Sequence, residues 1–162
     1  MLVVSNTSPV LNLALIGKLH LIKSQFSEIT LPESVIAELN LHKDIPGNED
    51  IRIAIKQHWI RIHKLTNLAV SSILKTYLDE GESDAIALAL ELKADIILLD
   101  EKDARSYARN LGLPMTGVIG ILVKGYFDGE IKSIRRSMED LETKAGFRIG
   151  KKLYNQIFNL EN

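Results

Sequence analysis

The sequence predicts an α/β protein with a central, mainly parallel sheet of about five strands and helices on both faces, a three-layer α/β/α arrangement. Two observations predict it. Short apolar runs typical of buried strands alternate with segments whose apolar residues recur at the helical period. A strand, a helix and a further strand in succession form a right-handed crossover, which makes the two strands parallel. The 162 residues are 46% hydrophobic, enough for one core, so we expect a single domain over residues 1–162.

The first half of the chain is predicted to supply three strands. Residues 2–4 are an apolar run without polar alternation, as in a strand buried on both faces. Ser8 as a side-chain cap and Pro9 at the first helical position then predict a helix, which Gly17 ends. The other elements predicted in this half are a helix at 18–25, a strand at 28–31, helices at 33–39 and 49–57, and a strand at 59–63.

The second half is predicted to add two strands and the most apolar helix. Residues 83–92 are apolar almost all round, which indicates a buried helix, and residues 94–99 form a continuous apolar strand followed by Asp100. Two amphipathic helices over residues 131–160 are expected either to pack on the core or to form a dimer interface. The remaining elements predicted here are helices at 68–78, 103–111 and 118–126, and a strand at 113–116.

Composition excludes several classes of protein. The 20 basic and 21 acidic side chains nearly cancel, so a nucleic-acid site would have to be local. The absence of cysteine removes disulfides and thiolate chemistry and fits a reducing compartment. No apolar run approaches the length that spans a membrane, and the apolar N-terminus lacks a basic leader. We therefore expect a cytoplasmic protein without a membrane partner.

Polar side chains follow the predicted strands where a ligand site is expected. Open parallel sheets bind ligands beyond the carboxyl ends of their strands. Asn6 ends the first strand and Asp100 ends the strand at 94–99. Asp84 lies in the first turn of the helix before that strand, and Glu38 lies on the helix after the second strand. These four oxygen-bearing side chains are expected to converge.

The stretch from residue 79 to residue 103 is strongly acidic, with Lys93 and Lys102 as its only bases. A group of carboxylates with few basic partners is the usual setting for a hard cation such as Mg²⁺ or Mn²⁺. The acids are Asp79, Glu80, Glu82, Asp84, Glu91, Asp95, Asp100, Glu101 and Asp103.

Four motifs follow one another along the chain: VVSNTSP at 3–9, Glu38 on its helix, GESDAIALA at 81–89 and ILLD at 97–100. In this order they resemble the PIN-domain family. The ending, GFRI at 146–149 followed by a last helix, is similar to small prokaryotic PIN-like proteins, a group that includes the VapC-type toxin ribonucleases.

The resemblance implies a metal-dependent ribonuclease that cleaves single-stranded RNA with Mg²⁺ or Mn²⁺. Glu38, Asp84 and Asp100 match the family's acidic positions, which implies that they hold the metal and are catalytic. The resemblance further implies a toxin of a toxin–antitoxin pair, with a small antitoxin-like partner and a homodimer. Side chains expected to assist are Asp103 as a further metal ligand, and Ser8 and Glu82 as auxiliary groups.

Asn6 departs from the family, whose first acid is normally an aspartate. An amide oxygen can ligate a hard cation, but it carries no formal charge and cannot act as a base. We therefore expect weaker metal binding than in relatives with aspartate. The alternative function is a catalytically weakened PIN-like module that binds nucleic acid or a partner protein.

Simpler explanations exist for each residue taken singly. Asn6 is also a common turn residue, and acids such as Glu82 and Asp84 stabilise helix N-termini. A phosphoacceptor domain of the receiver type is disfavoured because no acid pair follows the first strand. The basic residues of the tail could contact phosphate, although a solvated helical face explains them slightly better. They are Arg135, Arg136, Lys144, Arg148, Lys151 and Lys152.

Overall fold

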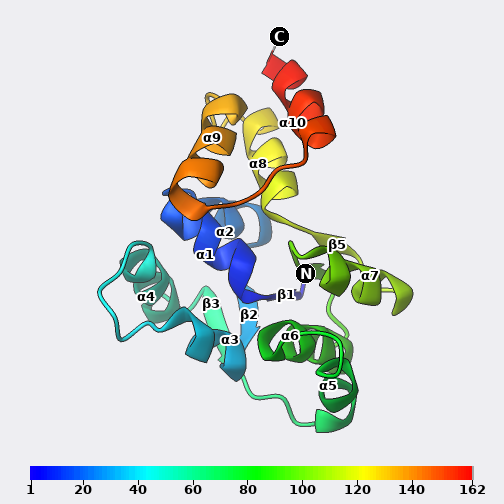
Figure 1. The fold of residues 1–162 in the computed structure, drawn as a ribbon. Helices are drawn as coiled ribbons and strands as arrows, with labels where there is room; N and C mark the ends of the chain where they lie inside the picture. The colour runs from blue at the N-terminus through cyan, green and yellow to red at the C-terminus, as the bar shows by residue number, and fades with distance from the viewer. Residues whose placement is uncertain (162) are drawn as a thin grey trace.

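A five-stranded, fully parallel sheet lies at the centre of the protein in the computed structural model, which describes residues 1–161 (Figure 1). The strand order is β3-β2-β1-β4-β5. The chain therefore builds outward from β1 to β3 and then returns to the other side of β1, so the order reverses between β1 and β4. The strands are β1 (Val3–Ser5), β2 (Ile29–Pro32), β3 (Ile60–His63), β4 (Ile96–Leu98) and β5 (Met115–Thr116).

Helices cover both faces of the sheet, and alternate residues of β1 and β4 belong to different cores. Val3 and Leu98 join the core formed with α1, α2, α3, α4, α8 and α9. Val4 and Ile97 join the core formed with α5, α6 and α7. The helices are α1 (Thr7–Leu15), α2 (His20–Phe26), α3 (Glu33–Leu39), α4 (Asn48–Lys56), α5 (Leu68–Leu74), α6 (Glu80–Glu91), α7 (Lys102–Asn110), α8 (Val118–Phe127), α9 (Ile134–Ala145) and α10 (Lys151–Phe158).

The predicted fold class is confirmed, and the differences that bear on the site lie at the starts of two helices. α1 begins at Thr7 with Asn6 at its N-cap position, so Ser8 is not the cap. α6 begins at Glu80, three residues before the predicted start. Its start is fixed by a capping box, in which Asp79 Oδ1 accepts from Glu82 N at 2.8 Å and Glu82 Oε2 accepts from Asp79 N at 3.3 Å.

The two C-terminal helices gather beside α8 at one end of the molecule (Figure 1). Leu141 on α9 is fully buried in the core that contains α1 and α8. α10 packs less extensively, and its buried residue Ile157 clusters with Ile134 and Met138 of α9. Residues 146–150 link α9 to α10, and we call this segment the strap. Within residues 1–161, no helix combines the length and apolar character needed to cross a membrane.

Candidate active site

A cleft of about 710 Å³ opens beyond the carboxyl ends of β1 and β4, where the strand order reverses. This is the position at which open parallel sheets bind ligands. The strap closes one side of it. The cleft is lined by Asn6, Thr7, Ser8, Leu11, Asn12, Glu38, Asp79, Glu82, Asp100, Glu101, Ala145, Gly146, Phe147 and Arg148.

Asn6 is the first residue after β1, and its side chain is only 4% exposed. Its backbone N donates to Leu98 O at 3.1 Å, which fixes the residue against β4. The side-chain Oδ1 is buried and accepts no hydrogen bond in the described part of the chain. A buried acceptor without a donor costs free energy, of the order of 1–3 kcal/mol. Such an atom in a cleft favours a bound donor or cation.

Glu38 reaches the cleft from α3 and is held at both carboxylate oxygens. Oε1 accepts from Gly81 N at 3.0 Å, and Oε2 accepts from the Thr7 hydroxyl. A Cβ atom at residue 81 would lie 2.5 Å from Oε1, so only glycine allows this approach to the start of α6. Each oxygen retains a lone pair for another ligand.

Asp100 lies just beyond β4 and is also held at both oxygens. Oδ2 accepts from the Ser8 hydroxyl at 2.8 Å, and Oδ1 accepts from Val118 N at 2.8 Å. Ser8 in turn accepts from Asn12 Nδ2 at 2.9 Å, so its hydroxyl positions the carboxylate. Burial raises the pKa of Asp100, although these hydrogen bonds and the Arg105 guanidinium act in the opposite direction. Ser8, predicted as an auxiliary residue, thus contacts Asp100 directly.

Glu82 is the carboxylate that α6 contributes to the cleft. Its side chain is only 8% exposed. Burial raises the pKa of Glu82, and the nearby carboxylates of Asp79, Glu101 and Glu38 raise it further. The cleft therefore concentrates negative charge that its own cations do not balance.

Asp84 is not among the residues that line the cleft. Residues two apart on an α-helix point about 200° away from each other, so Glu82 and Asp84 cannot face the same side. Asp84 Oδ1 accepts from the Ser71 hydroxyl on α5 and lies 3.7 Å from Lys75 Nζ. Asp84 thus links α5 to α6. Its predicted catalytic role stays a prediction, but the geometry supports Glu82 for that role.

Asp103 also lies outside the cleft. It is an exposed residue in the first turn of α7 and lines an adjoining hollow of about 260 Å³ with Tyr77. Sequence reasoning gave Asp79 and Glu101 no individual role, although both line the cleft. The Asp79–Glu82 capping box was the signal available in the sequence, because these two acids stand three residues apart at the start of α6.

The oxygen atoms that line the cleft are chemically suited to bind a hard divalent cation. The cleft offers carboxylates from Glu38, Glu82 and Asp100 and the amide oxygen of Asn6, and oxygen donors of this kind suit Mg²⁺ and Mn²⁺. Within residues 1–161, no three His, Cys, Asp or Glu side chains are grouped closely enough to form a metal site.

A family model described as DUF3368, a PIN domain, matches residues 2–162. The chain belongs to the PIN-domain family. PIN domains generally use divalent metal ions and bind nucleic acid, in agreement with the acidic cleft of this PIN domain.

Among solved structures, this PIN domain is similar to a PilT N-terminus domain protein from the hyperthermophilic archaeon Sulfolobus solfataricus P2. The TM-score is 0.55 at 19% identity, covering 76% of this chain and 92% of that one. At this identity the likeness shows the fold alone. No curated protein matches the chain.

The contact between Asp84 and α5 predicts a stability effect. We expect Asp84→Ala to lower the free energy of unfolding by about 1–3 kcal/mol, because it leaves the Ser71 hydroxyl, 1% exposed, without its acceptor. Urea unfolding measures the change. As a control, Asp103→Ala removes an exposed acid and is expected to change stability by no more than about 0.5 kcal/mol. Equal unfolding midpoints for the two variants would contradict this role of Asp84.

Proposed function

We propose that the protein is a metal-dependent endoribonuclease that hydrolyses phosphodiester bonds of single-stranded RNA, with Mg²⁺ or Mn²⁺ as its cofactor. The observation that carries the proposal is the buried Asn6 Oδ1, which has no hydrogen-bond partner and belongs to a residue lining the same cleft as Glu38, Glu82 and Asp100. Membership of the PIN-domain family supports nuclease chemistry, and the motif resemblance supports RNA as the substrate.

Some residues of the cleft would hold the metal, and one would accept a proton. Asp100 and Glu38, each fixed at both oxygens, would hold the metal together with the neutral oxygen of Asn6. A bound divalent cation would lower the pKa of its water and offset the charge of the phosphodiester. Glu82, whose pKa burial raises, would be a stronger base than an ordinary glutamate and is suited to accept a proton from the attacking water.

The direct test is hydrolysis of a single-stranded RNA by the purified protein. We expect cleavage with added Mn²⁺, no cleavage with excess chelator, and recovery when Mn²⁺ is restored. A fully paired RNA duplex of the same sequence is the matched substrate and is expected to be cut at least about tenfold more slowly. Turnover that is equal with and without chelator would rule out the proposed function.

A second function is favoured by one observation, the neutral amide at position 6. A site that lacks one carboxylate binds metal less tightly, and the protein would then act by binding nucleic acid or a protein partner with little hydrolysis. The two functions differ in what an added negative charge at position 6 should do to metal binding and hydrolysis.

We also propose, from the motif resemblance, a toxin that pairs with a small antitoxin-like protein and forms a homodimer. Light scattering after size-exclusion chromatography measures the oligomeric state. Growth arrest on expression, relieved by a co-expressed neighbouring gene, would support the toxin role. A monomer at micromolar concentration would contradict the dimer.

A further inference from the structure

A second hollow lies on the other side of the strap from the acidic cleft and has the opposite electrostatic character. Its volume is about 420 Å³. It shares Asp100, Phe147 and Arg148 with the acidic cleft, so the two spaces are neighbours separated by the strap. We call it the basic groove and define it by Arg105, Thr116, Gly117, Gly120, Phe147 and Arg148.

Arg105 is a fixed cation in the basic groove. It is half-buried on α7, and its Nη1 donates to Leu99 O at 2.7 Å. A guanidinium has several N–H donors, and this bond leaves most of them unused. The positive charge is close enough to Asp100 to act against the upward shift of that carboxyl's pKa. Arg105 is thus held in a fixed orientation near Asp100, just beyond the end of β4.

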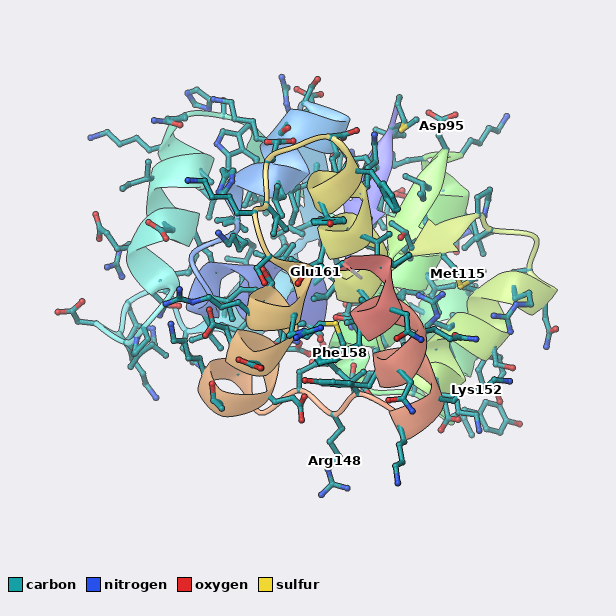
Figure 2. The ribbon with its side chains drawn as sticks, turned by 90° about the horizontal axis from the view of Figure 1, so that it is seen from above. Asp95, Met115, Arg148, Lys152, Phe158 and Glu161 are labelled. Carbon is teal, nitrogen blue, oxygen red and sulfur yellow. The ribbon has the colours of Figure 1, made fainter. Side chains whose placement is uncertain are left out.

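Arg148 is a basic residue at the boundary between the acidic cleft and the basic groove. It is exposed on the strap, and Figure 2 shows its side chain projecting away from the body of the protein. Among residues 1–161 it forms no hydrogen bond or ion pair, and it is the one basic residue that lines the acidic cleft. Two other tail cations have partners: Arg135 lies 3.4 Å from the centre of the Phe158 ring, and Lys144 Nζ lies 3.6 Å from Asp140 Oδ1.

Two glycines allow side chains to pack closely at the floor of the basic groove. A Cβ atom at residue 117 would lie 2.5 Å from Asp100 Oδ1 and 3.2 Å from Arg105 Nη1. A Cβ atom at residue 120 would collide with the Thr116 hydroxyl. Any larger residue at 117 would therefore displace Asp100 or Arg105, so glycine at this position lets both side chains pack against the backbone at the start of α8.

We propose that the basic groove binds a phosphate of single-stranded RNA next to the bond that is cut, so that the strand passes from the acidic cleft across the strap. This inference rests on the proposed function. A polyanionic strand needs compensating cations beside a cleft lined by carboxylates, and guanidinium groups match phosphate oxygens in charge and geometry. Arg105 supplies the anchored contact, and Arg148 supplies the contact that reaches both spaces.

The test is binding of a fluorescently labelled ten-nucleotide single-stranded RNA, measured by anisotropy in chelator so that no hydrolysis occurs. Arg148→Ala is expected to weaken binding roughly tenfold and to lower the slope of log affinity against log salt by about one. Arg148→Lys keeps the charge and is expected to recover most of the affinity. The matched control is Arg136→Ala, an exposed arginine on α9 that lines neither space, and it is expected to bind like the wild type.

Hydrolysis with Mn²⁺ gives a second readout. Arg148→Ala is expected to act mainly on KM for the ten-nucleotide RNA, with a smaller effect on kcat, because the neighbouring phosphate that it binds carries the same charge in the ground state and the transition state. Wild-type protein that binds RNA but never cleaves it would overturn the proposed function and leave the basic groove supported. Equal affinity and equal salt slopes for Arg148→Ala and Arg136→Ala would overturn the basic groove, as would a wild type that does not bind the RNA.

Discussion

Glu82→Gln is expected to slow hydrolysis of single-stranded RNA by at least about 100-fold, whereas Asp84→Asn leaves the rate per folded molecule unchanged. Both changes replace an acid by its amide on the same helix, two residues apart. Glu82 faces the acidic cleft, and Asp84 faces Ser71 on α5. A glutamine at position 82 can still accept from Asp79 N, so the capping box that starts α6 is kept and only the charge is lost.

Circular dichroism first measures the folded fraction of each variant. Single-turnover cleavage of one RNA substrate with Mn²⁺ then measures both rates. Asp100→Asn serves as a positive control, because its amide oxygen can still accept from Val118 N while the carboxylate charge is removed. It is expected to lose activity as Glu82→Gln does. If Asp84→Asn is inactive and Glu82→Gln is active, the catalytic acid of α6 is Asp84 and the assignment from geometry fails.

The strand-end residues could be predicted from sequence because their positions depend on local patterns. An apolar run that stops at a polar residue marks a strand end, and the carboxyl ends of parallel strands share one edge of the sheet. Asn6 and Asp100 were placed in this way, and the structure brings both to the cleft. Glu38 followed from its place on the helix after the second strand.

The choice between Glu82 and Asp84 depended on a finer quantity, the residue at which α6 begins. A predicted start at residue 83 puts Asp84 in the first turn, near the sheet edge. In the structure α6 begins at Glu80, and Glu82 in its first turn lines the cleft, whereas Asp84, about 200° further round the helix, contacts α5. Ser8 was misassigned as a cap for a related reason, since its hydroxyl has a competing partner, Asp100, that is distant in sequence.

Arg148 could not be singled out among the basic residues of the tail because its role depends on the path of the strap. In sequence it is one of several cations near the C-terminus. Only the packing of α9 on α1 and α8 carries the strap past the sheet edge and puts this residue beside both the acidic cleft and the basic groove. Contacts between segments so far apart in the chain leave no periodic signal.

Asn6→Asp is expected to tighten Mn²⁺ binding on the order of tenfold and to speed RNA hydrolysis, because a carboxylate adds charge to a ligand set that a neutral amide leaves incomplete. The same change should lower the stability of the metal-free protein. Asn6 is buried beside Glu38 and Asp100, so a new negative charge there repels its neighbours when no cation is present. Added Mn²⁺ should then stabilise the variant more than the wild type, since stabilisation by a ligand grows with the logarithm of its affinity.

Isothermal titration with Mn²⁺ and thermal unfolding with and without the metal measure these effects. The matched control is Asn67→Asp, which adds the same charge at another helix N-cap, that of α5, where the side chain accepts from Ala69 N at 3.0 Å outside the cleft. It should leave Mn²⁺ affinity unchanged. An inactive wild type that gains cleavage on Asn6→Asp would identify a weakened binding module. An active wild type that gains nothing would show that the amide oxygen suffices as a ligand, and the binding-module function would then fail.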